Sequence, residues 1–246
     1  TGFEVWKTDG TDPDGDGIYE WQQVVREGFG DTWNQWGMTM EVLNDYLYVG
    51  SAVGAGMVMK DSEIVGTRPF DVIRIDKDDN VELVVGAYTP SDPPAGWPTL
   101  RTPSSGWPAG FGNPLNVYVW HMEVHDGILY LGTFDACMFL QYIPDLIAGL
   151  LDGETLDSLS EELDLALSEA DFQQMLQEYP ELAQSMEELL KAYAQARETG
   201  DLTQLLSLLL QYFGGADLWK TADGINWLPV TLNGFDNQYN LSLIHI

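Results

Sequence analysis

The sequence is poor in cysteine and in positive charge. Among its 246 residues Cys137 is the single cysteine, which excludes an internal disulfide framework and a four-cysteine zinc site. The apolar run around Cys137 predicts a buried, unreactive thiol. Lys and Arg together number 10 against 39 Asp and Glu, so the formal net charge is -29. Because such a surface repels phosphate backbones and anionic lipid, we expect neither nucleic acid nor a membrane surface as a partner.

A long apolar run is also missing. No stretch approaches the roughly 20 residues that a membrane-spanning helix needs, so we expect no membrane insertion. The chain is nevertheless 45% hydrophobic, which argues against a disordered protein and predicts a buried core. Thr1 to Trp6 have the pattern of a strand and not of a signal peptide, so we expect the native chain to begin earlier. The acidity has two explanations that composition leaves open: adaptation to saline surroundings or binding of divalent cations.

An internal repeat is the most informative feature of the sequence. Residues 28–50 align without a gap with residues 110–132, and a third copy begins at Gly234. A second unit recurs between these copies, at residues 3–10, 70–76 and 216–224, and each copy leads to another short strand. Apolar and polar residues alternate in runs of about five between Asn-Asp, Asp-Gly and Lys-Asp-Asp-Asn turns. This pattern predicts consecutive antiparallel hairpins.

Four short strands per unit, with an aromatic residue at a fixed place, are typical of a propeller blade. The predicted fold class is therefore all-β: a partial, open β-propeller of four-stranded antiparallel blades with an α-helical insert. The blades are predicted in residues 1–140 and continue in residues 214–240. Four tryptophans recur at equivalent blade positions and are predicted to be core residues: Trp6, Trp21, Trp219 and Trp227.

One turn carries a family resemblance. Thr221-Ala-Asp-Gly-Ile-Asn-Trp227 resembles the Asp-box of sialidase-like propellers of the BNR type, in which Ser or Thr precedes Asp-Gly and Trp stands three residues after the Gly. Lys7-Thr-Asp-Gly10 resembles the same turn, with its Trp displaced to Trp21. The resemblance implies a propeller fold alone, because the Asp-box is a structural hairpin element in that family. It does not extend to sialidase activity, since no arginine stands in the Arg-Ile-Pro context of the family's arginine trio.

Residues 141–213 have a helical period in place of the two-residue period. Amphipathic helices are predicted over 181–198 and 202–213, with leucines on the inner face and acidic residues outside. We interpret residues 141–213 as an acidic helical insert that packs on itself or on the blades, and the alternative is a protein-docking surface or a cap over the propeller. Residues 241–246 do not match the repeat and are interpreted as a non-native tail.

A candidate calcium loop lies near the start of the chain. Asp12, Asp14 and Asp16 stand at every second residue and are followed by glycine, as in the first half of an EF-hand loop. Gln23 occupies the place of the bidentate Glu of that motif, and Glu20 is the candidate substitute. The sequence leaves two alternatives, a structural Ca²⁺ site and a solvated acidic turn.

Candidate ligand-binding residues are aromatic. Trp97 and Trp107 lie in a loop rich in Pro, Gly and Ser, where they either stack on a ligand or fold back over the end of the blades. Trp120 and His121 are further candidates, because His121 occurs in one copy of the repeat alone, and the alternative for His121 is a hydrogen-bonding role without a ligand. His121 and His125 do not form a metal pair, since four residues on a strand span about 13 Å.

These features lead to three functional hypotheses. The first is a non-catalytic, exported β-propeller that binds a carbohydrate or protein ligand, with an extracellular or periplasmic location. The second is a glycoside hydrolase or lyase with its active site in blades outside this sequence. The third is an interaction scaffold centred on the insert. An enzyme requires a pocket with converging carboxylates, whereas a binding module requires exposed aromatic rings without such convergence.

Overall fold

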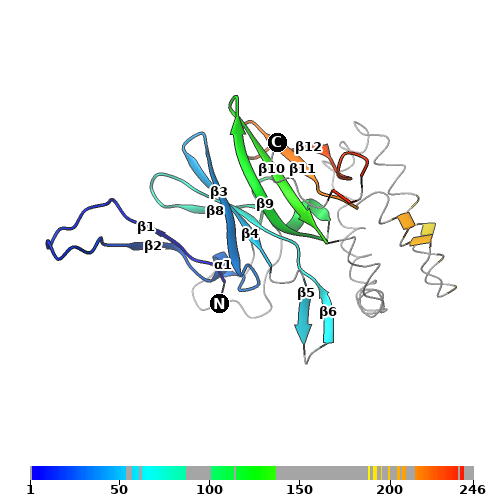
Figure 1. Cartoon of the computed structure of the whole chain (residues 1–246), viewed down its shortest axis with the longest axis horizontal. Helices are drawn as coiled ribbons and strands as arrows, with labels where there is room; N and C mark the ends of the chain where they lie inside the picture. Colours follow the sequence, from blue (N-terminus) through cyan, green and yellow to red (C-terminus); the bar gives the residue numbers. More distant parts are fainter. Residues whose placement is uncertain are drawn as a thin grey trace.

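The computed structural model describes most of the strand-rich part of the chain. The described residues are 2–53, 57–60, 63–86, 101–113, 115–136, 214–237 and 239–240, with single positions between 188 and 208. Antiparallel strands dominate these residues, which confirms the all-β prediction (Figure 1). The single positions belong to the predicted insert and have helical backbone, and no described helix has the length and hydropathy to cross a membrane. Trp97, Cys137 and residues 241–246 lie outside the described residues.

The strands are, in chain order, β1 (Val5–Lys7), β2 (Gln22–Val25), β3 (Trp36–Leu43), β4 (Tyr46–Ala52), β5 (Met57–Lys60), β6 (Glu63–Thr67), β7 (Val72–Ile75), β8 (Val81–Val85), β9 (Asn116–His125), β10 (Ile128–Asp135), β11 (Leu218–Thr221) and β12 (Leu228–Thr231). Two short helical turns, α1 (Glu27–Gly30) and η2 (Ala109–Gly112), precede β3 and β9.

Two four-stranded antiparallel meanders form most of the structure. Unit 1 has the order β3-β4-β7-β8, and unit 2 has the order β9-β10-β11-β12. The pairing of Ala52 with Tyr118 joins them into one eight-stranded sheet, to which β3 adds through β4. Backbone hydrogen bonds from Val53 to Val117 and from Phe70 to Asn116 strengthen this junction. In each unit we call the first two strands the inner hairpin and the last two the outer hairpin. The separate sheet β1-β2 projects from the body of the molecule as a third outer hairpin (Figure 1).

The three outer hairpins share one irregularity. The strand register shifts between Val5 and Trp6 in β1, between Val72 and Ile73 in β7, and between Leu218 and Trp219 in β11. The same shift at the same place shows that the short sequence repeat is also a structural repeat.

Each unit is interrupted at the same place. The hairpin β5-β6 is inserted between β4 and β7 of unit 1, and the predicted helical insert falls between β10 and β11 of unit 2. Both insertions therefore join the second strand of a unit to its third strand.

A turn of the same geometry precedes the inner hairpins of both units and recurs at Gly234. Its glycines adopt a left-handed conformation, with φ of 62° at Gly28 and 61° at both Gly110 and Gly234. An asparagine six residues later donates a side-chain hydrogen bond to the carbonyl of that glycine. The pairs are Asn34 with Gly28, Asn116 with Gly110 and Asn240 with Gly234. The Gly-Phe-Gly and Asn matches of the sequence repeat are thus explained by turn geometry.

Two apolar clusters hold the units together. One cluster lies between units 1 and 2 and includes Tyr48, Val72, Met122, Leu131 and Trp219. The other lies between β1-β2 and unit 1, and it includes Val5, Val25, Val49, Ile73 and Leu83. The strand alternation of the sequence places these side chains inward, so burial of apolar area holds the units together.

The prediction of four core tryptophans is half correct. Trp219 and Trp227 are each 3% exposed and belong to the cluster between the units. Trp6 and Trp21, however, are 48% and 58% exposed, so the prediction is wrong for them. The reason is positional, because β1, among the described strands, pairs with β2 alone and has no inner hairpin beside it.

The turn from Thr221 to Trp227 fastens unit 2 to unit 1. Asp223 accepts hydrogen bonds from the amides of Ile225 and Asn226 at 2.9 and 2.8 Å. The Trp227 indole donates to the carbonyl of Gly224 at 3.2 Å. Asn44 of unit 1 donates its side-chain amide to the carbonyl of Ala222 at 2.8 Å. The carboxylate therefore stabilises a tight turn, as the sequence predicts.

Candidate functional site

Four aromatic side chains lie together at one end of the inner hairpins. The Tyr118 ring centre is 5.3 Å from that of Phe134, 6.2 Å from that of Trp120 and 6.4 Å from that of Trp36. Trp120 and Phe134 are 5.6 Å apart. Trp36 is 50% exposed and the other three are partly buried. We call these four residues the aromatic cluster, which offers ring surface to solvent on paired strands.

A β-bulge turns Trp120 and His121 to the outside. In the pairing of β9 with β10, His121 lies opposite Gly132 and Val119 lies opposite Thr133, so Trp120 is the extra residue. Val119 and Met122 on either side are buried, whereas Trp120 is partly buried and His121 is exposed. The two predicted ligand-binding residues therefore lie next to each other outside the core.

The same bulge occurs in unit 1. Thr39 lies opposite Gly50 and Gly37 opposite Ser51, so Met38 is the extra residue, and it is 39% exposed. The bulge position in both units thus presents a large apolar side chain to solvent. The sequence repeat aligns Met38 with Trp120, but a bulge has no signal in an alignment of this kind.

The aromatic cluster adjoins the starting points of both insertions. Ala52, the last residue of β4, pairs with Tyr118, and Asp135, the last residue of β10, pairs with Asn116. The chain leaves each unit for its insertion directly after these two residues. Insertions at such a place supply variable surface next to a fixed site.

Of the other two predicted ligand-binding residues, Trp107 is described by the structure and Trp97 is not. Trp107 packs against the cluster between the units, with its ring centre 5.0 Å from that of Trp219 and 6.0 Å from that of Phe111. It folds back over the core, which is the second of the two alternatives that the sequence allows. Trp97 lies outside the described residues. Trp36, Tyr118 and Phe134 were not predicted as site residues, although the repeat alignment does superpose Trp36 on Tyr118.

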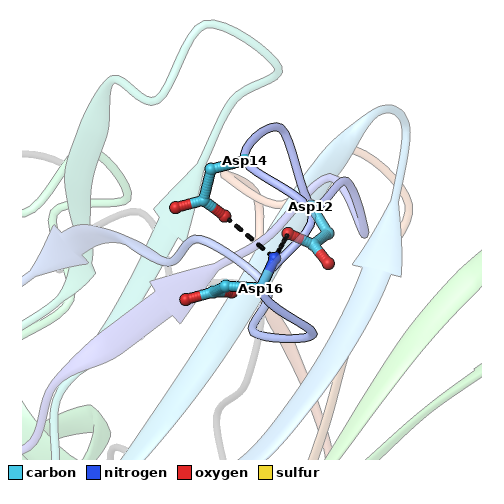
Figure 2. Close-up of side chains that lie close together, drawn as sticks. All are labelled: Asp12, Asp14 and Asp16. Carbon is cyan, nitrogen blue, oxygen red and sulfur yellow. Dashed lines mark hydrogen bonds between the residues drawn. The ribbon is translucent and has the colours of Figure 1, made fainter.

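The predicted metal loop brings three of its four acidic residues together. Ligand oxygens of Asp12, Asp14 and Asp16 all lie within 4.8 Å of one another, and Glu20 is not part of this group. Figure 2 shows the Asp12 and Asp14 side chains directed at the backbone nitrogen of Asp16, which donates to them at 3.2 and 3.4 Å. The group lies in the loop between β1 and β2.

Backbone hydrogen bonds already hold this loop. Asp12 accepts from the amides of Gly17 at 2.8 Å and Gly15 at 2.9 Å. The bond from Gly17 contributes most to keeping the pKa of Asp12 below its ordinary value, so Asp12 carries its negative charge at neutral pH. Carboxylates spaced in this way suit a hard cation, for which Ca²⁺ with oxygen ligands is the natural choice.

A buried ionic network, which sequence reasoning missed, lies away from the exposed face. Asp71 is bonded to Arg101 at 2.8 Å and to Arg68 at 3.3 Å, and Arg68 also contacts Asp31. All four side chains are at most 6% exposed. Burial alone would raise the pKa of Asp71, but the charges of Arg68 and Arg101 together lower it. These carboxylates hold unit 1 together and are closed to substrate.

The equivalent carboxyl group of unit 2 has a different environment. Asp217 accepts from Asn116 at 2.6 Å, just as Asp71 accepts from Asn34 at 2.7 Å. The carboxyl group of Asp135, which accepts a hydrogen bond from Asn113 at 2.8 Å, lies close enough to affect the charge of Asp217. Burial, followed by the charge of Asp135, raises the pKa of Asp217 well above its ordinary value. Asp217 is 2% exposed, so this unusual carboxyl group is also closed to substrate.

No protein-family model, curated protein or solved structure matches this chain. The resemblance to Asp-box propellers therefore stays a prediction from the residues of one turn.

Proposed function

We propose that this chain is part of an exported, non-catalytic β-propeller that binds a carbohydrate through the aromatic cluster. The propeller assignment is supported by two four-stranded meanders that share an apolar cluster and repeat their register shifts, bulges and turns. The sequence repeat and the Asp-box-like turn at Thr221 to Trp227 support the same assignment.

The observation that carries the function is the partly exposed aromatic cluster. Trp and Tyr rings present flat apolar faces that match the C–H faces of a pyranose, while their polar edges remain hydrated. Tyr118 and Phe134 are stacked at an interplanar angle of 22°, which leaves a fixed surface. With a net charge of -29, the chain favours neutral or cationic saccharides over sulfated or carboxylated ones.

The described carboxylates favour binding over hydrolysis. Asp31 and Asp71 are buried in ion pairs, and Asp217 is buried beside Asp135. A glycosidase needs two carboxyl groups that flank the substrate, within roughly 5–10 Å of each other. These aspartates are therefore closed to a saccharide at the aromatic cluster. The carboxylate near the cluster is that of Glu123, which lies 3.7 Å from His121.

Calcium has a structural part in this proposal. We propose that Asp12, Asp14 and Asp16 bind one Ca²⁺ ion that stiffens the loop between β1 and β2. The support is the gathering of three carboxylates with glycines at the turn.

Calorimetric titration tests the binding function. The probes are a neutral β-glucan hexasaccharide, a chitosan hexasaccharide and heparin. We expect saturable binding of one of the first two and none of heparin. Trp120→Ala should weaken binding about tenfold or more, since truncating an aromatic anchor costs on the order of 1–2 kcal/mol. Tyr19→Ala is the matched control, because Tyr19 is 56% exposed and lies outside the aromatic cluster.

Three results of the same titrations would contradict the proposed function. Equal affinity of the chain and the Trp120→Ala variant would remove the aromatic cluster from the site. Binding of none of the saccharides would remove carbohydrate as the ligand class and favour a protein ligand. Release of new reducing ends during the titration would show a glycoside hydrolase.

A further inference from the structure

A groove with a volume of about 610 Å³ runs between β1 and the inner hairpin β3-β4. Its apolar lining comes from both sides and includes Val5, Trp6, Met40, Val42 and Leu47. The charged residues at the groove are already engaged in part: Lys7 pairs with Asp79, and Asp76 accepts two amide hydrogen bonds within its own turn. The groove is thus an apolar trough beside a strand and not a polar reaction site.

Residues of β1 line this groove, and β1 pairs along one edge alone within the part of the chain that the structure describes. In unit 1, β7 pairs with β4 on one side and β8 on the other. In unit 2, β11 pairs with β10 and β12. Their counterpart β1 pairs with β2 alone among the described strands. A strand with one open edge is a template for the addition of another strand.

Equivalent side chains show what is missing beside β1. Trp6 is 48% exposed, whereas its counterparts Ile73 and Trp219 are 1% and 3% exposed. Met40 is 47% exposed, whereas its counterpart Met122 is 1% exposed. The same positions are buried where an inner hairpin or the next unit covers them. The exposed apolar lining of the groove therefore has the composition of a packing face.

We propose that this groove is a strand-addition site for a two-stranded antiparallel hairpin with the pattern of the chain's own inner hairpins. The pattern follows from the two occupied positions, which carry Leu-Tyr-Val-Gly in β4 and Leu-Tyr-Leu-Gly in β10. The register follows as well. Gly50, Val49 and Tyr48 lie opposite Val72, Ile73 and Arg74. The added hairpin accordingly places Gly opposite Val5, an aliphatic residue opposite Trp6 and Tyr opposite Lys7.

This inference goes beyond the proposed function, and it rests on other residues. It concerns the packing face of β1 and β3, whereas carbohydrate binding concerns the far ends of the inner hairpins. Loss of either property leaves the other unchanged.

Site-specific cross-linking tests both the occupant and the register. The probe is a synthetic peptide of residues 34–53, added to the Cys137→Ser chain that also carries Lys7→Cys. Peptide carrying Tyr48→Cys should form a disulfide at least about tenfold faster than peptide carrying Val49→Cys, because adjacent residues of a strand point to opposite faces. Mass spectrometry of the cross-linked product gives the rate and the site.

Two groove variants and one matched control complete the test. Met40→Glu and Val42→Lys change exposed side chains of the groove, so the chain should fold, and peptide capture should be lost. Val230→Lys is the control, because Val230 is 42% exposed on β12, and capture should persist. Equal cross-linking of the two peptides, or no capture by the folded chain, would overturn the proposal. A disulfide-linked dimer formed in preference to peptide capture would assign the groove to a second copy and overturn it too.

Discussion

Asp71 and Asp217 occupy equivalent places in the two units, but their neighbours carry opposite charges. Asp71 is held between Arg68 and Arg101, at 3.3 and 2.8 Å. Asp217 is buried next to Asp135, and burial together with the Asp135 charge raises the pKa of Asp217. The same backbone position is therefore stabilised by charge in unit 1 and penalised by charge in unit 2.

Substitution of these two residues by asparagine should have opposite effects. Asp71→Asn leaves buried arginine charge uncompensated and should lower the free energy of unfolding at pH 7 by about 3 kcal/mol. Asp217→Asn puts a neutral amide in place of a carboxyl group whose ionisation is disfavoured by burial and Asp135, and it keeps an acceptor for Asn116, so it should raise stability at pH 8. Urea unfolding of both variants measures the two changes. Equal destabilisation by both substitutions would contradict the assigned surroundings.

The pH dependence of the Asp217 effect follows from the direction of its pKa shift. Above about pH 4 the unfolded chain loses the Asp217 proton while the folded chain retains it, so the folded state loses stability as pH rises toward the raised pKa. The advantage of Asp217→Asn should therefore be absent at pH 4 and present at pH 8. An advantage independent of pH would show that charge is not its cause.

Asp223 should make the opposite contribution. Burial disfavours its charge, but hydrogen bonds from Asn226 and Ile225 outweigh burial and lower its pKa to about 2. Its stabilising effect is full above the unfolded pKa of 3.8 and is lost as pH falls through about 2. Because Asp223 is exposed, we expect Asp223→Ala to lower stability at pH 6 by only about 1 kcal/mol. Thermal melts should show the full loss at pH 6 and a smaller loss at pH 2.

At the scale of single elements, a comparison of two turn glycines distinguishes the cost of backbone strain from the cost of a steric clash. Gly224 has φ of 79°, and a Cβ there would overlap the Tyr48 hydroxyl of unit 1. Gly15 has a similar φ of 73° with nothing within 4 Å of a Cβ. We expect Gly15→Ala to cost about 1 kcal/mol and Gly224→Ala about 3 kcal/mol or more in unfolding free energy. Chemical denaturation of both variants checks this, and equal losses would show that the turn does not contact unit 1.

The hairpins could be predicted from sequence because their signals are local. Alternation of apolar residues and the Asn-Asp and Asp-Gly turns determine each hairpin within a few residues. Neighbours far apart in sequence have no such signal. Whether Trp6 is buried depends on a strand beside β1, and the exposure of Trp120 depends on a bulge opposite Gly132. For the same reason the partners Arg68 and Arg101 of Asp71 could not be predicted.

At the scale of the whole molecule, cations can stabilise a chain with a net charge of -29 in two ways, and one experiment separates them. If the loop with Asp12, Asp14 and Asp16 binds Ca²⁺, a free Ca²⁺ concentration about a hundred times the Kd should raise the free energy of unfolding by about 2.7 kcal/mol. NaCl at equal ionic strength reports the general screening of acidic repulsion. The melting temperature should rise more in CaCl₂ than in NaCl. The double variant Asp14→Ala, Asp16→Ala should abolish this difference. Equal rises in both salts would leave the loop without a calcium role.

The chain as a whole is a set of repeated units whose packing faces are apolar and whose inner hairpins end in an aromatic cluster. Fluorine NMR of the chain labelled with 5-fluorotryptophan, titrated with the saccharide that binds in calorimetry, tests this most directly. The proposed function predicts shifts of the Trp36 and Trp120 resonances, while the buried Trp219 and Trp227 remain unchanged. Shifts confined to Trp6 and Trp21, or at the buried tryptophans alone, would contradict it.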